Sequence, residues 1–171
     1  MSKCNYVIDT SYLDEYYQID KYSKKQNYPE IKKLFKEAAR NESRLYVPVP
    51  VIFEIANHIA HVRGSQRYEL VERFRKDIEK SCSVHSSPFI IVPCKEFESI
   101  QLLINNLIQF SRKYVQQGLG LTDTAVYLQA KQLSEDKKNV FNLPVHIWTK
   151  DRSLKALEPD REENPFMGLK E

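Results

Sequence analysis

The stretch Tyr6-Val7-Ile8-Asp9-Thr10-Ser11 opens the fold and indicates its class. The apolar run at residues 6–8 predicts a short buried strand at about 5–8. The hydroxyls of Thr10 and Ser11 suit the start of a helix directly after it. Asp9 stands at the junction, where a carboxylate close to the core is costly unless a positive partner lies nearby. The stretch therefore predicts a strand that leads into a helix, with an acid between them.

The same alternation of strand and helix continues along the chain. Apolar runs and turn signals predict further strands at about 44–47, 88–93 and 145–149. Helical periodicity predicts helices over 30–39, 51–62, 65–82 and 100–115. A further helix follows Thr122, which is expected to cap it, and a short one lies near 153–158. Strands separated by helices indicate an α/β fold with a parallel sheet covered on both faces. We expect one domain over residues 1–158 and a loosely ordered tail over 159–171.

Size and composition narrow the class of protein. A chain of 171 residues suffices for one domain, and 42% hydrophobic with 29% charged residues favours a folded globule. The net charge of +3 does not by itself indicate a nucleic-acid partner. Three cysteines without a CxxC pair argue against a zinc ribbon or a disulfide framework. Without a signal peptide or an apolar run of about 18 residues, we expect a cytoplasmic protein that does not enter the membrane.

Four acidic residues stand in places that are unusual for their type. Asp9 follows the first strand, Glu54 lies in an apolar helix, Asp123 lies at a helix start, and Asp151 follows the last strand. Each alone has an ordinary explanation as a cap or a solvated helix face. Together they are improbable as four independent caps. Because ligand sites in parallel sheets lie beyond the carboxyl ends of strands, we expect the acids to converge on a divalent cation.

These acids and their neighbours resemble the motifs of PIN-domain nucleases, a family that includes the VapC-like toxin ribonucleases of bacterial toxin–antitoxin pairs. The matching stretches are residues 7–13, 51–55, 121–125 and 148–152. The resemblance implies a three-layer α/β/α sandwich around a central parallel sheet, and Mg²⁺- or Mn²⁺-dependent cleavage of RNA. The residues that it implies are Asp9, Glu54, Asp123 and Asp151 as the catalytic, metal-binding set, with Ser11 and Thr149 in support.

Two departures from the family leave the biological role open. The segment over 65–117 is long, and Thr124-Ala125 stands where Ala alone commonly follows the third acid. An antitoxin partner and a homo-oligomer therefore both stay open. Lys150 and Arg152 flank Asp151 and are candidates for holding RNA phosphates, with simple charge shielding of Asp151 as an equal alternative.

A second function also fits the residues. A PIN-like module could bind RNA or a protein partner without catalysing a reaction. The four retained acids argue against it, because a surface that only binds phosphates gains nothing from clustered negative charge. His58 and His61, three apart on one helix, lack the third ligand of a zinc site, so we interpret them as polar-face residues.

Overall fold

The computed structural model describes residues 3–83, 89–92, 107–108, 110–115, 118–137 and 143–169. Its centre is a four-stranded sheet in the order β3-β2-β1-β4, in which every neighbouring pair is parallel. The strands are β1 (Asn5–Ile8), β2 (Arg44–Pro48), β3 (Ile90–Val92) and β4 (Val145–Trp148). All four strands lie where the apolar runs predict them.

The helices are α1 (Thr10–Tyr17), α2 (Tyr28–Arg40), α3 (Val49–Ala60), α4 (Gln66–Ser83), α6 (Leu121–Lys137) and α7 (Arg152–Lys155), with a 3₁₀ turn η1 (Lys25–Asn27) before α2. The helices predicted over 30–39, 51–62 and 65–82 begin and end within two residues of those bounds. For α1 and α6 only the start was predicted, and the helix predicted near 153–158 ends earlier, at Lys155. Half of the helix predicted over 100–115, residues 100–106 and 109, lies outside the described residues. Within it, residues 107–108 are helical and η3 (Phe110–Tyr114) is a π-helical turn.

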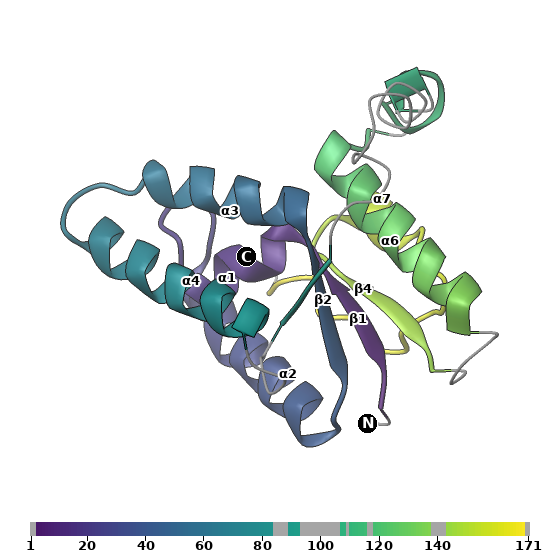
Figure 1. Cartoon of the computed structure of the whole chain (residues 1–171), viewed down its shortest axis with the longest axis horizontal. Helices are drawn as coiled ribbons and strands as arrows, with labels where there is room; N and C mark the ends of the chain where they lie inside the picture. Colours follow the sequence, from purple (N-terminus) through teal and green to yellow (C-terminus); the bar gives the residue numbers. More distant parts are fainter. Residues whose placement is uncertain are drawn as a thin grey trace.

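The three layers follow from the direction that the chain takes between strands. The connections β1 to β2 and β2 to β3 step one way across the sheet, and the connection from β3 to β4 returns to the far side of β1. Because parallel crossovers are right-handed, this reversal places α6 on the face opposite the earlier helices. Figure 1 shows α2 and α4 on one side of the sheet and α6 on the other. The expected α/β/α sandwich is confirmed.

The core is formed where the sheet is covered by helices. All four residues of β1 and of β4 are buried, as strands covered on both faces must be. Trp148 of β4 is only 2% exposed and lies at the centre of an aromatic cluster. Its ring lies 4.2 Å from that of Tyr6, 5.3 Å from that of Phe35 and 5.5 Å from that of Tyr12, centroid to centroid. These rings fix β4 against β1, α1 and α2.

The C-terminal segment, residues 159–169, is held against the domain, so the expectation of a loosely ordered tail is wrong for these residues. The Tyr12 hydroxyl donates to the Phe166 carbonyl at 2.6 Å, and the Leu169 N–H donates to Asn27 Oδ1 at 3.0 Å. The Val145 N–H donates to Asp160 Oδ2 at 2.8 Å. The physical reason is that β4 lies at the edge of the sheet formed by the described strands, and its backbone groups need partners that the segment supplies.

Within the described part of the chain, the helices are too short or too polar to traverse a lipid bilayer.

Candidate active site

The site lies at the point where the strand order reverses. The chain leaves β1 toward β2 on one side, while β4 pairs with β1 on the other side. In open α/β sheets, ligands bind beyond the carboxyl ends of the strands at this reversal. The register pairs Ile8 with Trp148, so the residues that follow these two strands emerge next to each other. Asp9 follows β1, and Thr149 follows β4.

Asp9 is the most firmly held carboxylate of the site. It is 4% exposed and is the N-cap of α1. Its Oδ1 accepts the Thr10 N–H at 2.7 Å. Its Oδ2 accepts the Ser11 hydroxyl at 2.7 Å, the Thr149 hydroxyl at 2.8 Å and the Ser11 N–H at 3.4 Å. Burial raises the pKa of Asp9, and the hydrogen bonds from Ser11 and Thr149 offset part of that effect.

Ser11 and Thr149 form two bridges from the β4–α7 turn to Asp9. The Ser11 hydroxyl accepts the Lys150 N–H at 3.0 Å, and the Thr149 hydroxyl accepts the Asp151 N–H at 3.0 Å. Each hydroxyl then donates its own hydrogen to Asp9. Both residues proposed to support the site therefore contact Asp9 directly, and they fix the turn to it.

Glu54 reaches the same place through α1 and α3. The Thr10 hydroxyl donates to Glu54 Oε2 at 2.9 Å, and one helical turn further on, His58 Nδ1 lies 2.9 Å from Asp14 Oδ1. Residues four apart on one helix thus pair with residues four apart on the other. The two helices run side by side in the same direction, joined by these two polar contacts. Thr10 and Asp14 anchor the α3 face that carries Glu54 and His58.

The contact between His58 and Asp14 contains a carboxyl group that is unusually deeply buried. Asp14 is 4% exposed, and burial raises its pKa to about 6, although His58 and Lys150 lower it. The negative charge of Asp9 raises it further. The His58 ring also stacks on the Tyr22 ring, with centroids 3.6 Å apart. His58 is therefore held by Asp14 and Tyr22, and it does not join His61, which contacts the carbonyl of Asn57.

Asp123 and Asp151 each cap a helix with one oxygen. Asp123, in the first turn of α6, accepts the N–H of Gly120, the residue before the helix, on Oδ2 at 2.7 Å; α6 begins at Leu121, so Thr122 lies inside the helix and is not the cap expected from the sequence. A Cβ added to Gly120 would meet this oxygen at 3.1 Å, which explains why glycine suits the position. Asp151 Oδ1 accepts the Leu154 N–H at 2.9 Å at the start of α7. The ordinary capping explanation thus holds for these acids, as it does for Asp9.

The four carboxylates nevertheless share one electrostatic environment. The pKa of Asp123 is raised to about 6, first by burial and then by the negative charges of Asp9, Asp151 and Glu54. Asp123 is therefore within electrostatic reach of the other three predicted acids. The four acids do not form a finished coordination shell: among the described residues, no group of three or more His, Cys, Asp or Glu side chains is spaced to hold a metal ion.

The two predicted phosphate ligands occupy different surroundings. The Lys150 ammonium forms an ion pair with Glu15, whose side chain is 0% exposed. Arg152 is exposed and lines a cleft of about 540 Å³ together with residues of the C-terminal segment. This cleft and a second one of about 590 Å³ lie along that segment, and neither is lined by the four carboxylates. The role of the two cations toward phosphate stays a prediction.

Several residues at the site were not predicted from the sequence. Thr10, Asp14 and Glu15 belong to α1, where two adjacent acids stand between aromatic residues of a short, largely buried helix. That placement is the signal that could have identified them. A second signal is spacing: Thr10 and Asp14 are four residues apart on one helix, and Glu54 and His58 are four residues apart on another.

No protein-family model, curated protein or solved structure matches the chain. The chemistry of the site is therefore inferred from its own residues, and the resemblance to PIN-domain nucleases stays a prediction.

Proposed function

We propose that this protein is a Mg²⁺- or Mn²⁺-dependent endoribonuclease that hydrolyses phosphodiester bonds at the four carboxylates. The observation that carries the proposal is the environment of Asp123, whose pKa is raised first by burial and then by the negative charges of Asp9, Asp151 and Glu54. Asp9 and Asp151 follow the carboxyl ends of β1 and β4, and Glu54 and Asp123 belong to α3 and α6. The choice of RNA as substrate comes from the resemblance of the four motifs to those of PIN-domain nucleases.

The donor atoms suit a hard divalent cation. Three of the four acids have one oxygen engaged by the protein, Glu54 by Thr10, Asp123 by Gly120 and Asp151 by Leu154, whereas both oxygens of Asp9 accept hydrogen bonds. Among the described residues, the second oxygens of these three carboxylates accept no hydrogen bond and are free for a ligand. Mg²⁺ and Mn²⁺ prefer such oxygens, and Mg²⁺ commonly binds through one or two carboxylates and several waters. That preference agrees with carboxylates that are near each other without forming a closed shell.

The residues of the chain have distinct tasks in this chemistry. Asp9 is oriented by Ser11 and Thr149, so it offers a fixed anchor at the strand edge. Glu54 and Asp123 approach from α3 and α6. A bound divalent ion supplies charge compensation, activation of the attacking water and stabilisation of the leaving oxygen. The formal charge of the four ionised acids, about −4, gives the ion its affinity.

The alternative is a PIN-like module that binds RNA or a protein partner without catalysis. One observation favours it, namely that no three metal-ligating side chains in the described ranges are spaced as a ready-made site. A thermal-shift titration with Mn²⁺ separates the two functions. A metal-dependent nuclease is stabilised by Mn²⁺, because a ligand selective for the folded state raises its stability, whereas a binding module without a cation site shows no shift.

The proposed function is tested with purified wild type, Asp9→Asn and Asp20→Asn. Several RNAs are incubated with each protein, with and without Mn²⁺. The amide oxygen of Asp9→Asn can still accept from the Ser11 and Thr149 hydroxyls, and asparagine is as good a helix N-cap as aspartate, so we expect the fold to be retained while the charge is lost. Cleavage by wild type requires Mn²⁺. We expect the Mn²⁺-dependent cleavage rate of Asp9→Asn to fall by more than roughly 100-fold, because substitutions outside the direct ligands of a metal cost roughly 10–100-fold.

Asp20 is exposed in the turn after α1, so Asp20→Asn is the matched control and keeps the wild-type rate. Undiminished cleavage by Asp9→Asn would overturn the assignment.

A further inference from the structure

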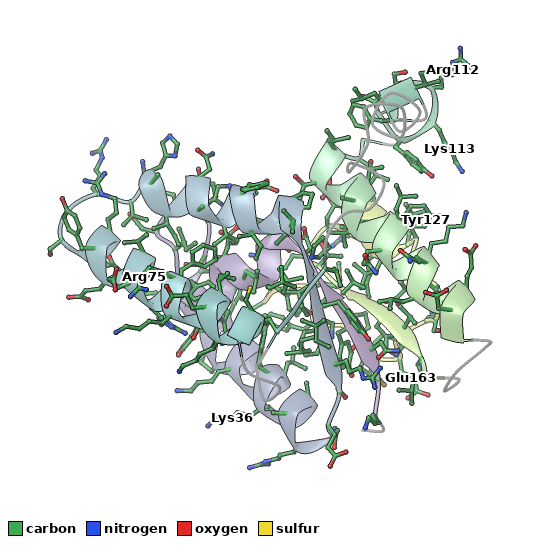
Figure 2. The ribbon with its side chains drawn as sticks, in the orientation of Figure 1. Lys36, Arg75, Arg112, Lys113, Tyr127 and Glu163 are labelled. Carbon is green, nitrogen blue, oxygen red and sulfur yellow. The ribbon has the colours of Figure 1, made fainter. Side chains whose placement is uncertain are left out.

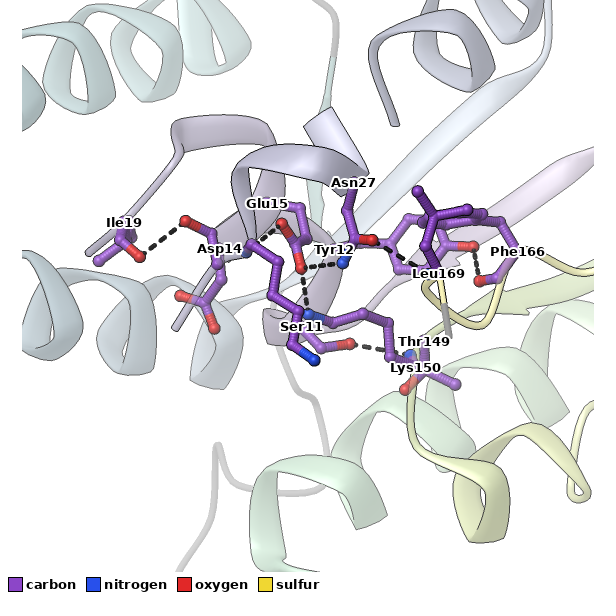
Figure 3. Close-up of polar contacts among 12 residues, drawn as sticks. Ser11, Tyr12, Asp14, Glu15, Ile19, Asn27, Thr149, Lys150, Phe166 and Leu169 are labelled. Carbon is purple, nitrogen blue, oxygen red and sulfur yellow. Dashed lines mark hydrogen bonds and ion pairs between the residues drawn. The ribbon is translucent and has the colours of Figure 1, made fainter. Parts of the chain in front are cut away.

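Lys150 occupies the turn between β4 and α7, between Thr149 and Asp151. The two ends of the lysine contact one face of α1. Its backbone N–H donates to the Ser11 hydroxyl at 3.0 Å, and its ammonium forms an ion pair with Glu15. Ser11 and Glu15 are four residues apart on the helix, so they lie one turn from each other along the same face. Figure 3 shows the lysine side chain reaching from the turn to Glu15.

Glu15 is a buried carboxylate with a complete set of partners. Its side chain is 0% exposed. Beside the Lys150 ammonium, Oε1 accepts the Asn27 side-chain N–H at 2.8 Å, and Oε2 accepts the Lys24 backbone N–H at 3.0 Å. A charge removed from water this completely is tolerated only when it is paired and hydrogen-bonded. The ion pair is therefore confined to one geometry, unlike a pair on the surface.

The C-terminal segment closes over this pair. Asn27 is 1% exposed, and while its amide N–H donates to Glu15, its Oδ1 accepts the Leu169 N–H at 3.0 Å. Gly168 adopts a φ of +87°, which favours glycine. A Cβ at this position would lie 3.8 Å from Cδ of Lys150 and 3.7 Å from the Asn27 amide nitrogen. The lysine stem thus runs beneath the segment that covers it.

We propose that the Lys150–Glu15 ion pair positions the β4–α7 turn for cation binding. The pair acts through the turn: it holds Thr149 against Asp9 and aims Asp151 at the shared site. Lys150 is then a positioning residue and not a phosphate ligand. This inference rests on the proposed function, because it assigns the pair a task at the same cation site. The C-terminal segment contributes by fixing Asn27 and covering the lysine.

The test compares Glu15→Gln, Lys150→Met and the double variant Glu15→Gln/Lys150→Met with wild type. Mn²⁺ affinity is measured by titration calorimetry, and kcat and KM are measured on RNA, at a temperature where each protein is folded by circular dichroism. The exchange rates of the Lys150 and Asp151 amide hydrogens report on the turn without any metal. Leu70→Ala, which opens a cavity under α4, is the control for a general loss of stability.

A positioning role predicts the same result in all three variants. Mn²⁺ affinity falls about 10–100-fold, kcat falls with KM for RNA little changed, and the two turn amides exchange faster. Lys150→Arg restores most of the affinity, because a guanidinium can also pair with Glu15. Leu70→Ala leaves the Mn²⁺ affinity of the folded protein unchanged. If Lys150 acted only through its charge, Lys150→Met would bind Mn²⁺ more tightly than wild type, because a positive charge near the site would be removed. A positioning role predicts weaker binding.

Three results would overturn the inference. The first is turn amides that exchange at the wild-type rate in Glu15→Gln. The second is a Lys150→Met variant with raised KM and unchanged Mn²⁺ affinity, which would make Lys150 a phosphate ligand. The third is a loss of stability in the Glu15 and Lys150 variants while Mn²⁺ affinity and kcat stay at the wild-type values, as expected for Leu70→Ala. If wild type itself neither binds Mn²⁺ nor cleaves RNA, the proposed function fails, and this inference fails with it.

Discussion

At the scale of single residues, each candidate ligand combines a structural and a chemical task. Asp9, Asp123 and Asp151 cap helices, so their positions follow from local backbone hydrogen bonding as well as from any ligand. In Asp123 and Asp151 this bonding engages one carboxylate oxygen and leaves the other available. Cap signals in the sequence indicated Asp9 and Asp151 as caps, whereas they assigned the cap of α6 to Thr122 instead of Asp123.

Asp14 gives a pH dependence of stability that can be isolated from the other acids. Its pKa is raised to about 6, so the folded state binds this proton more tightly than the unfolded state does. The stabilisation is present below the ordinary pKa of an aspartate and is lost as the pH rises through 6. Relative to Asp14→Asn, the unfolding free energy of wild type should fall by about 2–3 kcal/mol between pH 4 and pH 7.

Urea unfolding of both proteins at several pH values measures this difference. Asp20→Asn should follow the wild-type curve throughout, because Asp20 is exposed. A gap between wild type and Asp14→Asn that stays constant with pH would show that Asp14 does not titrate in this range. Wild type and Asp14→Asn both contain His58 and Lys150, the two basic residues that face the Asp14 carboxyl.

At the scale of elements, α1 organises the site. It begins at the Asp9 cap and carries Thr10 toward α3 and Glu15 toward the β4–α7 turn. The start of α1 and the positions of the strands could be predicted from hydroxyl and turn chemistry and from apolar runs, because these signals are local. The polar contacts between α1 and α3 could not, because they depend on how two helices far apart in the sequence pack together.

Thr10 tests this packing at one atom. Thr10→Val removes the hydroxyl that donates to Glu54 Oε2 while keeping nearly the same shape. We expect a loss of about 1 kcal/mol in unfolding free energy, typical for one hydrogen bond, and a fall of about 10-fold in Mn²⁺ affinity because Glu54 is no longer oriented. Thr10→Ser keeps the hydroxyl and should retain the wild-type affinity. Equal Mn²⁺ affinities in the valine and serine variants would show that this contact does not orient Glu54.

At the scale of the whole molecule, the C-terminal segment completes the domain. It supplies partners to the open edge of β4 and to Tyr12, and it covers the lysine beside the site. Figure 2 shows Glu163 of this segment beside the β4 side of the sheet, on the same side as Tyr127 of α6. The parallel sheet and its layers were predictable from the alternation of elements. The attachment of the segment was not, because its residues carry no periodic pattern and bind through single hydrogen bonds.

Removal of residues 159–171 should therefore destabilise the domain. The deletion takes away the partners of the Val145 N–H, the Tyr12 hydroxyl and the Asn27 carbonyl oxygen. At about 1 kcal/mol for each hydrogen bond, we expect a loss of at least about 3 kcal/mol in the unfolding free energy measured in urea. Tyr12→Phe, which removes one of these bonds, should lose about 1 kcal/mol. A deleted chain as stable as the full chain would contradict the role of the segment.

The most direct measurement is the position of Mn²⁺ in crystals of the wild-type protein, read from anomalous scattering. The proposal of one shared cation site predicts a Mn²⁺ peak at the carboxyl ends of β1 and β4, within coordination distance of Asp9 and at least one of Glu54, Asp123 and Asp151. RNA cleavage that depends on Mn²⁺, together with a clear absence of the ion from this strand edge, would contradict it.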